Sequence, residues 1–146
     1  MLKLYYENDV IRVSYDPDFS LGVGEWKGFA SSDEIRQIAL RSLEFVNEKG
    51  ITRWLADRRN MKAIRQQDQQ WTAEVFIPKL LESSLRRMAT IVSKDIFNQM
   101  AIEQIIRRSG GLGSIALRDF ENYKDAMEWL QQAFEEETTD RKPTAV

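Results

Sequence analysis

The chain has 146 residues and a net charge of −2, with 42% hydrophobic and 30% charged residues, which is the profile of one globular domain. This charge argues against a general nucleic-acid binder, which needs a broad basic face. The sequence has no cysteine and no histidine, which excludes disulfides, metal sites built on these residues, and Ser-His-Asp or Cys-His catalysis.

The same composition limits chemistry and location. Without histidine, cysteine or a convergent group of acids, we expect no enzymatic activity, no metal site and no cofactor. The first residues are too few and too polar for a signal peptide, and no apolar run approaches the ~20 residues of a membrane span. We therefore expect a cytoplasmic protein.

The N-terminal third begins with three short β-rich segments and continues with a helix. The β-rich segments cover residues 2–7, 10–15 and 20–26, and their tight turns predict an antiparallel meander. Ser31 and Glu34 form a capping-box pattern that opens the helix, and Gly50 ends it.

Single strands and helices alternate after Gly50. Strands are predicted at 53–57, 88–92 and 114–117, and helices at 68–84, where Asp68 is the expected cap, at 95–108, and after a cap at Asn122 up to Phe134. The inward residues of the 95–108 helix are predicted to be Ile96, Phe97, Met100, Ala101 and Ile105. This order implies right-handed crossovers and a largely parallel sheet within one domain, 1–134, and we expect the polar tail that follows, 135–146, to be disordered.

Several short motifs then carry a resemblance to a known family. They are Trp26-Lys27-Gly28, the run from Leu55 to Met61, Asp68-Gln69-Gln70-Trp71, Arg87-Met88-Ala89, and Phe120 with Ala126, Trp129 and Leu130. With the order of elements over roughly residues 2–133, they resemble the STAS domain, the fold of anti-sigma-factor antagonists, and its CRAL-TRIO relatives. More closely, the chain is similar to small bacterial STAS/CRAL-TRIO-like proteins of unassigned function. The resemblance implies an α/β fold with a STAS-like mixed sheet and four main helices.

One position departs from the STAS regulators that work as phosphoswitches. These proteins carry an Asp-Ser step at the start of the helix that follows the strand at 53–57, whereas this chain has Asp68-Gln69-Gln70. The nearest hydroxyl is that of Thr72, inside the first turn. We therefore predict that the protein is not a serine phosphoswitch.

A basic segment follows the predicted strand at 53–57, where sites form in βα proteins. Arg58, Arg59, Asn60, Lys62 and Arg65 are candidates for binding an anion or a partner, because guanidinium groups and helix N-termini attract anions. The alternative is an ordinary solvated loop, with Asp68 occupying the helix amides. Asp57 is interpreted as the partner of a neighbouring arginine or backbone amide rather than as a catalytic carboxylate or a magnesium ligand.

The helix predicted at 68–84 carries two apolar stripes. Ala73, Phe76, Ile77 and Leu80 form one, and Trp71, Val75 and Pro78 form another on nearly the opposite side. The second stripe is a candidate protein-contact face, including a homodimer seam. The alternative is that Pro78 kinks the helix and merges both stripes into one buried face.

Two classes of function remain open at this point. The first is a non-enzymatic STAS-like interaction or regulatory module that binds a protein partner or itself. The second, by analogy with the CRAL-TRIO group, is a binder of a lipid or another small apolar ligand.

Overall fold

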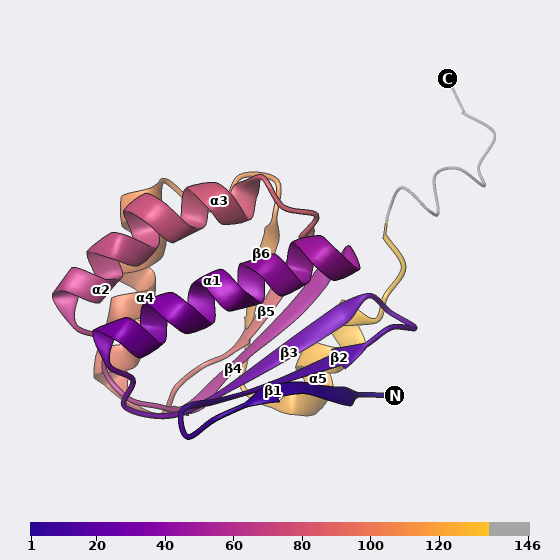
Figure 1. The fold of residues 1–146 in the computed structure, drawn as a ribbon, viewed down its shortest axis with the longest axis horizontal. Coiled ribbons are helices and arrows are strands. Elements are labelled where there is room, and N and C mark those ends of the chain that lie inside the picture. Colours follow the sequence, from indigo (N-terminus) through magenta and orange to yellow (C-terminus); the bar gives the residue numbers. More distant parts are fainter. Residues whose placement is uncertain (135–146) are drawn as a thin grey trace.

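A computed structural model describes residues 1–134 of the chain; the predicted tail, 135–146, lies outside the described residues. One six-stranded sheet runs through it in the order β1-β2-β3-β4-β5-β6 (Figure 1). The strands are β1 (Lys3–Glu7), β2 (Ile11–Asp16), β3 (Leu21–Gly28), β4 (Arg53–Met61), β5 (Arg87–Ile91) and β6 (Ala116–Phe120). The first three pair antiparallel and the last four pair parallel, which confirms the predicted mixed sheet.

Four main helical segments accompany the sheet, as predicted. They are α1 (Ser32–Lys49), the continuous segment formed by α2 (Gln66–Trp71), the π-helical η1 (Thr72–Phe76) and α3 (Ile77–Leu81), then α4 (Ile96–Ser109) and α5 (Tyr123–Leu130). The first three segments each connect neighbouring parallel strands, so right-handed crossovers place them all on one face of the sheet. α5 follows the last strand and covers the opposite face (Figure 1).

The helix ends show which sequence signals were sufficient. At α1, the Ser31 hydroxyl accepts from the Glu34 amide and the Glu34 carboxylate accepts from the Ser31 amide, which confirms the capping box. The next helix differs, because Arg65 rather than Asp68 is its N-cap. The Asp68 carboxylate is instead buried and accepts a hydrogen bond of 2.9 Å from the Ser32 hydroxyl, joining the starts of two helices.

β4 is longer than predicted, so part of the segment expected to be a basic loop is a strand. The strand was expected to end at Asp57, but it continues to Met61, which pairs with Gly28 at the end of β3. The long β3 provides backbone partners for these residues, and this tertiary pairing outweighs their low β-propensity.

Two boundaries near the C-terminal end also differ. β6 begins at Ala116 rather than Ser114, because the turn at Gly113 has a positive φ of 58° and delays the strand. α5 ends at Leu130, so the side chain of Phe134 is buried beyond the helix and not on it.

The inward face of α4 was partly predicted wrongly. Asn98 is only 1% exposed, and its amide nitrogen donates to the Lys62 carbonyl at 2.7 Å. This contact sets the rotation of the helix, whose buried face runs through Asn98, Ala101 and Ile105. The residues wrongly expected inside are Ile96, Phe97 and Met100, all of which are exposed.

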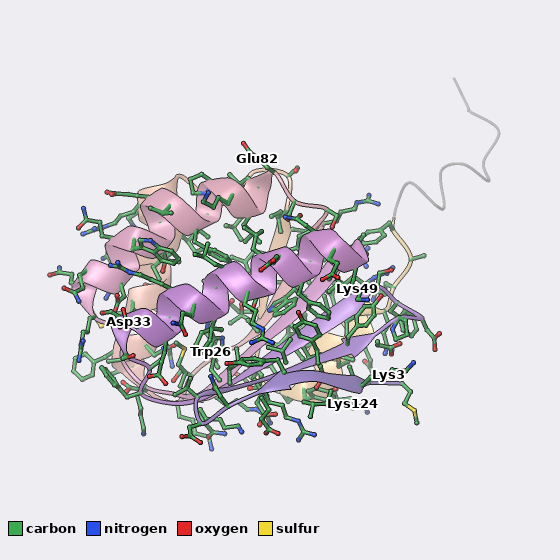
Figure 2. The ribbon with its side chains drawn as sticks, viewed as in Figure 1. Lys3, Trp26, Asp33, Lys49, Glu82 and Lys124 are labelled. Atoms are coloured by element: carbon green, nitrogen blue, oxygen red, sulfur yellow. The ribbon has the colours of Figure 1, made fainter. Side chains whose placement is uncertain are left out.

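Two hydrophobic clusters hold the layers together. The larger fills the space between the sheet and α1, α2–α3 and α4, and the smaller joins the sheet to α5. Trp54 belongs to the larger cluster and packs over Gly22 and Gly24, where a Cβ atom on Gly22 would overlap its ring. Trp26 is partly buried against the same cluster, and Figure 2 shows its side chain beneath α1. Both tryptophans therefore serve packing.

Candidate functional site

The predicted basic residues lie around a β-bulge near the end of β4. The register between β3 and β4 shifts between Glu25 and Lys27, so that two β4 residues, Arg58 and Arg59, stand opposite Trp26. A bulge bends its strand and redirects side chains, and such bulges are common beside functional sites. Here the two neighbouring arginines point to opposite faces of the sheet.

Arg59 lies on the α5 face and is paired with Asp57 there. Its Nη2 and Nε donate to the two oxygens of Asp57 at 2.6 and 3.0 Å, and its backbone amide donates to the same carboxylate. This forked geometry is the strong form of an arginine–carboxylate pair. The hydrogen bonds that Arg59 donates to the Asp57 carboxylate raise the pKa of Arg59. Burial, followed by the negative charge of Asp57, raises the pKa of the nearby Tyr123. Asp57 is thus paired with its neighbour, as the sequence analysis interpreted it.

Arg58 lies on the opposite face, under the helical layer. Trp54 and Ala56, which precede it on the same side of β4, belong to the larger cluster. The guanidinium donates from Nη1 to the Thr90 hydroxyl at 3.2 Å. Burial lowers the pKa of Arg58 to about 10, while the negative charge of Asp119 acts in the opposite direction. Arg58 is therefore a cation held partly inside the protein with little direct compensation.

The rest of the predicted set is dispersed. Asn60 and Lys62 are exposed where β4 ends, and the backbone amide of Lys62 donates to the Gly28 carbonyl. The exposed Arg65 holds its guanidinium 5.0 Å from the centre of the Phe29 ring. The structure does not gather the five residues into one cluster, because the bulge separates Arg58 from Arg59.

The two stripes of the α2–α3 segment differ in burial but are not fully separated, because Trp71 of the outer stripe stacks on Phe76 of the inward stripe. Three members of the inward stripe, Ala73, Ile77 and Leu80, are buried, whereas Val75 and Pro78 are exposed. The π-helical turn of η1 ends at Phe76, two residues before Pro78, whose missing amide removes one hydrogen bond of the helix.

Trp71 is already engaged within the chain. It is partly buried, stacks on Phe76 with ring centres 6.4 Å apart, and has the Arg36 guanidinium 5.6 Å from its ring. Of the candidate interface residues, Val75 and Pro78 are therefore the more available for contact.

The sequence patterns did not indicate an exposed apolar cluster at the start of α4. Ile96 is 57% exposed, Phe97 67% and Met100 53%. The only sequence signal was indirect: a polar residue, Asn98, occupies the buried face, so a count of hydrophobic residues assigned the wrong side of the helix. We call these three residues the α4 patch.

The helical layer also contains two hollows. An apolar cavity of about 110 Å³ lies between the sheet and α1, η1 and α3. A separate cleft of about 500 Å³ lies between α4 and the β5–β6 side of the sheet, and Arg58 reaches both.

Comparison with known proteins places the fold. No family model matches the sequence, and no curated protein matches it either. Among solved structures, the chain is similar to an uncharacterized DUF3478-family protein from Shewanella loihica PV-4 that has a SpoIIAA-like fold. The TM-score is 0.52 at 14% identity, over 89% of this chain and 92% of that one. At this identity the likeness concerns the fold alone, and it confirms the resemblance seen in the sequence: the chain has a SpoIIAA-like, STAS-type α/β fold.

Proposed function

We propose that this protein is a non-enzymatic STAS-like module that acts by binding another protein through the α4 patch. The observation that carries the proposal is the exposure of three large apolar side chains, Ile96, Phe97 and Met100, on adjacent turns of one helix. Contiguous apolar surface of this kind marks interaction sites, and methionine and aromatic residues are typical of contact surfaces.

The patch is not needed to hold α4 in place. The helix packs through Asn98, Ala101 and Ile105, and it begins at Asp95, whose carboxylate accepts from the Phe97 amide at 2.9 Å. Apolar groups that contribute nothing to the fold are a liability for aggregation unless a partner covers them. The α4 patch is therefore favoured over the stripe of Trp71, Val75 and Pro78, whose tryptophan already has partners within the chain.

The lipid-binding alternative is less well supported by the interior. The cavity under α1 and α3 measures about 110 Å³, whereas ligand pockets typically measure ~300–1,000 Å³. A lipid in that position would require the helices to separate. Within residues 1–134, no helix is long and apolar enough to cross a membrane.

The test compares three single substitutions at exposed apolar positions. Phe97→Glu changes the α4 patch, Val75→Glu changes the outer stripe of the α2–α3 segment, and Leu40→Glu, on an isolated exposed leucine of α1, is the matched control. Each tagged variant is used for quantitative affinity purification from its native cell, and sedimentation velocity measures self-association.

We expect Phe97→Glu to lose the specific partner, or the dimer, while its melting temperature stays unchanged. Truncating a contact hot spot costs ~2 kcal/mol, which is about a 30-fold loss of affinity. Leu40→Glu should behave as the wild type. If only Val75→Glu lost binding, the contact surface would be the outer stripe of the α2–α3 segment. Identical binding in all three variants would refute a contact through either surface.

A further inference from the structure

The cleft between α4 and the β5–β6 side of the sheet has the size and lining of a small-molecule site. Its volume of about 500 Å³ falls within the ~300–1,000 Å³ of typical ligand pockets. Its apolar wall consists of Val92, Ile102, Ile106 and Leu117. α4 packs against α2 and η1, and the cleft lies between α4 and the residues of β5 and β6 that face it.

Strand register places polar groups in a row on the cleft floor. Ala56 pairs with Thr90, and Thr90 pairs with Asp119, so these residues share one face of the sheet. Arg58 lies two residues beyond Ala56 and reaches back to the Thr90 hydroxyl. A guanidinium has five N–H groups, and one hydrogen bond is described for this one. Asp119 acts on it electrostatically from the far side of Thr90 without forming a direct ion pair with it in the described chain.

Asn98 adds an acceptor that lacks a partner. Its amide nitrogen donates to the Lys62 carbonyl, which fixes the orientation of the amide because the oxygen could not make that bond. The Oδ1 atom is then buried with no hydrogen-bond partner among the described residues. Buried polar atoms are rarely left unpaired, so this oxygen calls for a donor from a ligand or a water molecule.

The charges around the cleft balance. Arg58 and Arg107 are cations, and Glu103 and Asp119 are anions, so the four titratable side chains of the lining sum to zero. A polyanion such as a phosphate ester would meet both carboxylates, and a simple cation would meet both arginines. A small molecule that carries one positive and one negative group complements this arrangement, in which Arg58 and Asp119 lie on either side of Thr90.

We propose that the cleft binds an α-amino acid with an apolar side chain. The carboxylate of the ligand lies against the free N–H groups of Arg58, and its ammonium group faces Asp119 and the acceptor of Asn98. The side chain packs on Ile102, Ile106 and Leu117. This site is distinct from the α4 patch and does not depend on the proposed protein contact.

Three matched probes test each part of the assignment. L-Leucine carries both charges, 4-methylpentanoate lacks the ammonium group, and 3-methylbutylamine lacks the carboxylate. Calorimetric titration of the full chain should show saturable binding of leucine, with each of the other two at least about tenfold weaker. Matched variants are Arg58→Met, Asp119→Asn and, on the exposed side of α4 outside the cleft, Arg108→Met.

We expect Arg58→Met to lose leucine binding, Asp119→Asn to bind leucine no better than 4-methylpentanoate, and Arg108→Met to match the wild type. If Arg58→Met fails to fold, Arg58→Lys replaces it, and binding should still fall because the fork geometry is lost. If the titration with leucine shows no saturable heat, the buried oxygen of Asn98 is satisfied by water alone and the proposal is wrong. Equal binding of leucine and 4-methylpentanoate, or unchanged binding in the Arg58 variant, would overturn it as well.

Discussion

Arg58 and Arg59 are consecutive residues with opposite surroundings. Arg59 faces α5, where the buried carboxylate of Asp57 holds it with three hydrogen bonds. Arg58 faces the helical layer, where one hydroxyl accepts from it and a 500 Å³ cleft leaves the rest of its donors accessible. On the α5 face the Asp57–Arg59 pair satisfies both oxygens of its carboxylate, whereas the helical face carries the two hollows and the buried Asn98 oxygen that has no hydrogen-bond partner among the described residues. Any binding role of this strand is therefore expected on the helical face.

The largest contrast should come from making the same substitution on both faces. Ala126 on α5 is fully buried in a closed cluster, so Ala126→Leu should overpack it and lower the free energy of unfolding by ~1–3 kcal/mol. Ala39 on α1 lines the 110 Å³ cavity, so Ala39→Leu should partly fill it and raise the free energy of unfolding by ~0.5–1 kcal/mol. Urea denaturation of both variants measures the difference. Equal destabilisation would show that the helical face is as closely packed as the α5 face.

A smaller effect concerns pH on the α5 face. The pKa of Tyr123 is raised above its ordinary 10.0 in the folded state, first by burial and then by Asp57. The native protein therefore holds this proton more tightly than the unfolded chain does. The resulting stability is fully present below pH 10 and is lost as the pH rises through the folded pKa.

Comparison with Tyr123→Phe isolates this group. The difference in phenolate absorbance between wild type and variant should titrate above pH 10, and the variant should lose less stability over that range. A difference spectrum that titrates at or below pH 10 would show that burial and the negative charge of Asp57 do not raise the pKa of Tyr123.

The sequence predicted the parts of the fold that depend on local signals. The capping box at Ser31 and the αL glycine at Gly50 fixed α1, and the alternation of strands and helices fixed the mixed sheet. The same signals failed where tertiary contacts decide. β4 extends to Met61 because β3 offers it a partner, and Asp68 turns inward because the Ser32 hydroxyl lies beside it.

The predicted basic residues lie in and just after β4, but they do not form the single cluster that the sequence suggested. Arg58 and Arg59 look equivalent in sequence, and only the bulge opposite Trp26 assigns them to different faces. The α4 patch could not be recognised, because the burial of Asn98 depends on a carbonyl, that of Lys62, in a distant segment. Periodicity identifies a helix well, but it assigns the buried side only when that side is apolar.

The different roles of the two arginines are tested most directly by comparing one variant of each. Arg58→Met and Arg59→Met make the same chemical change at adjacent positions, and each variant is examined by urea denaturation and by leucine titration. Arg59→Met leaves the buried Asp57 without its cation and should lower the free energy of unfolding by ~2–3 kcal/mol. This loss is smaller than for a fully buried ion pair, because Arg59 is partly solvated. Leucine binding should persist in this variant. Arg58→Met should change stability by less than ~1 kcal/mol and abolish binding. The reverse pattern, or equal effects of both variants on stability and binding, would contradict the account.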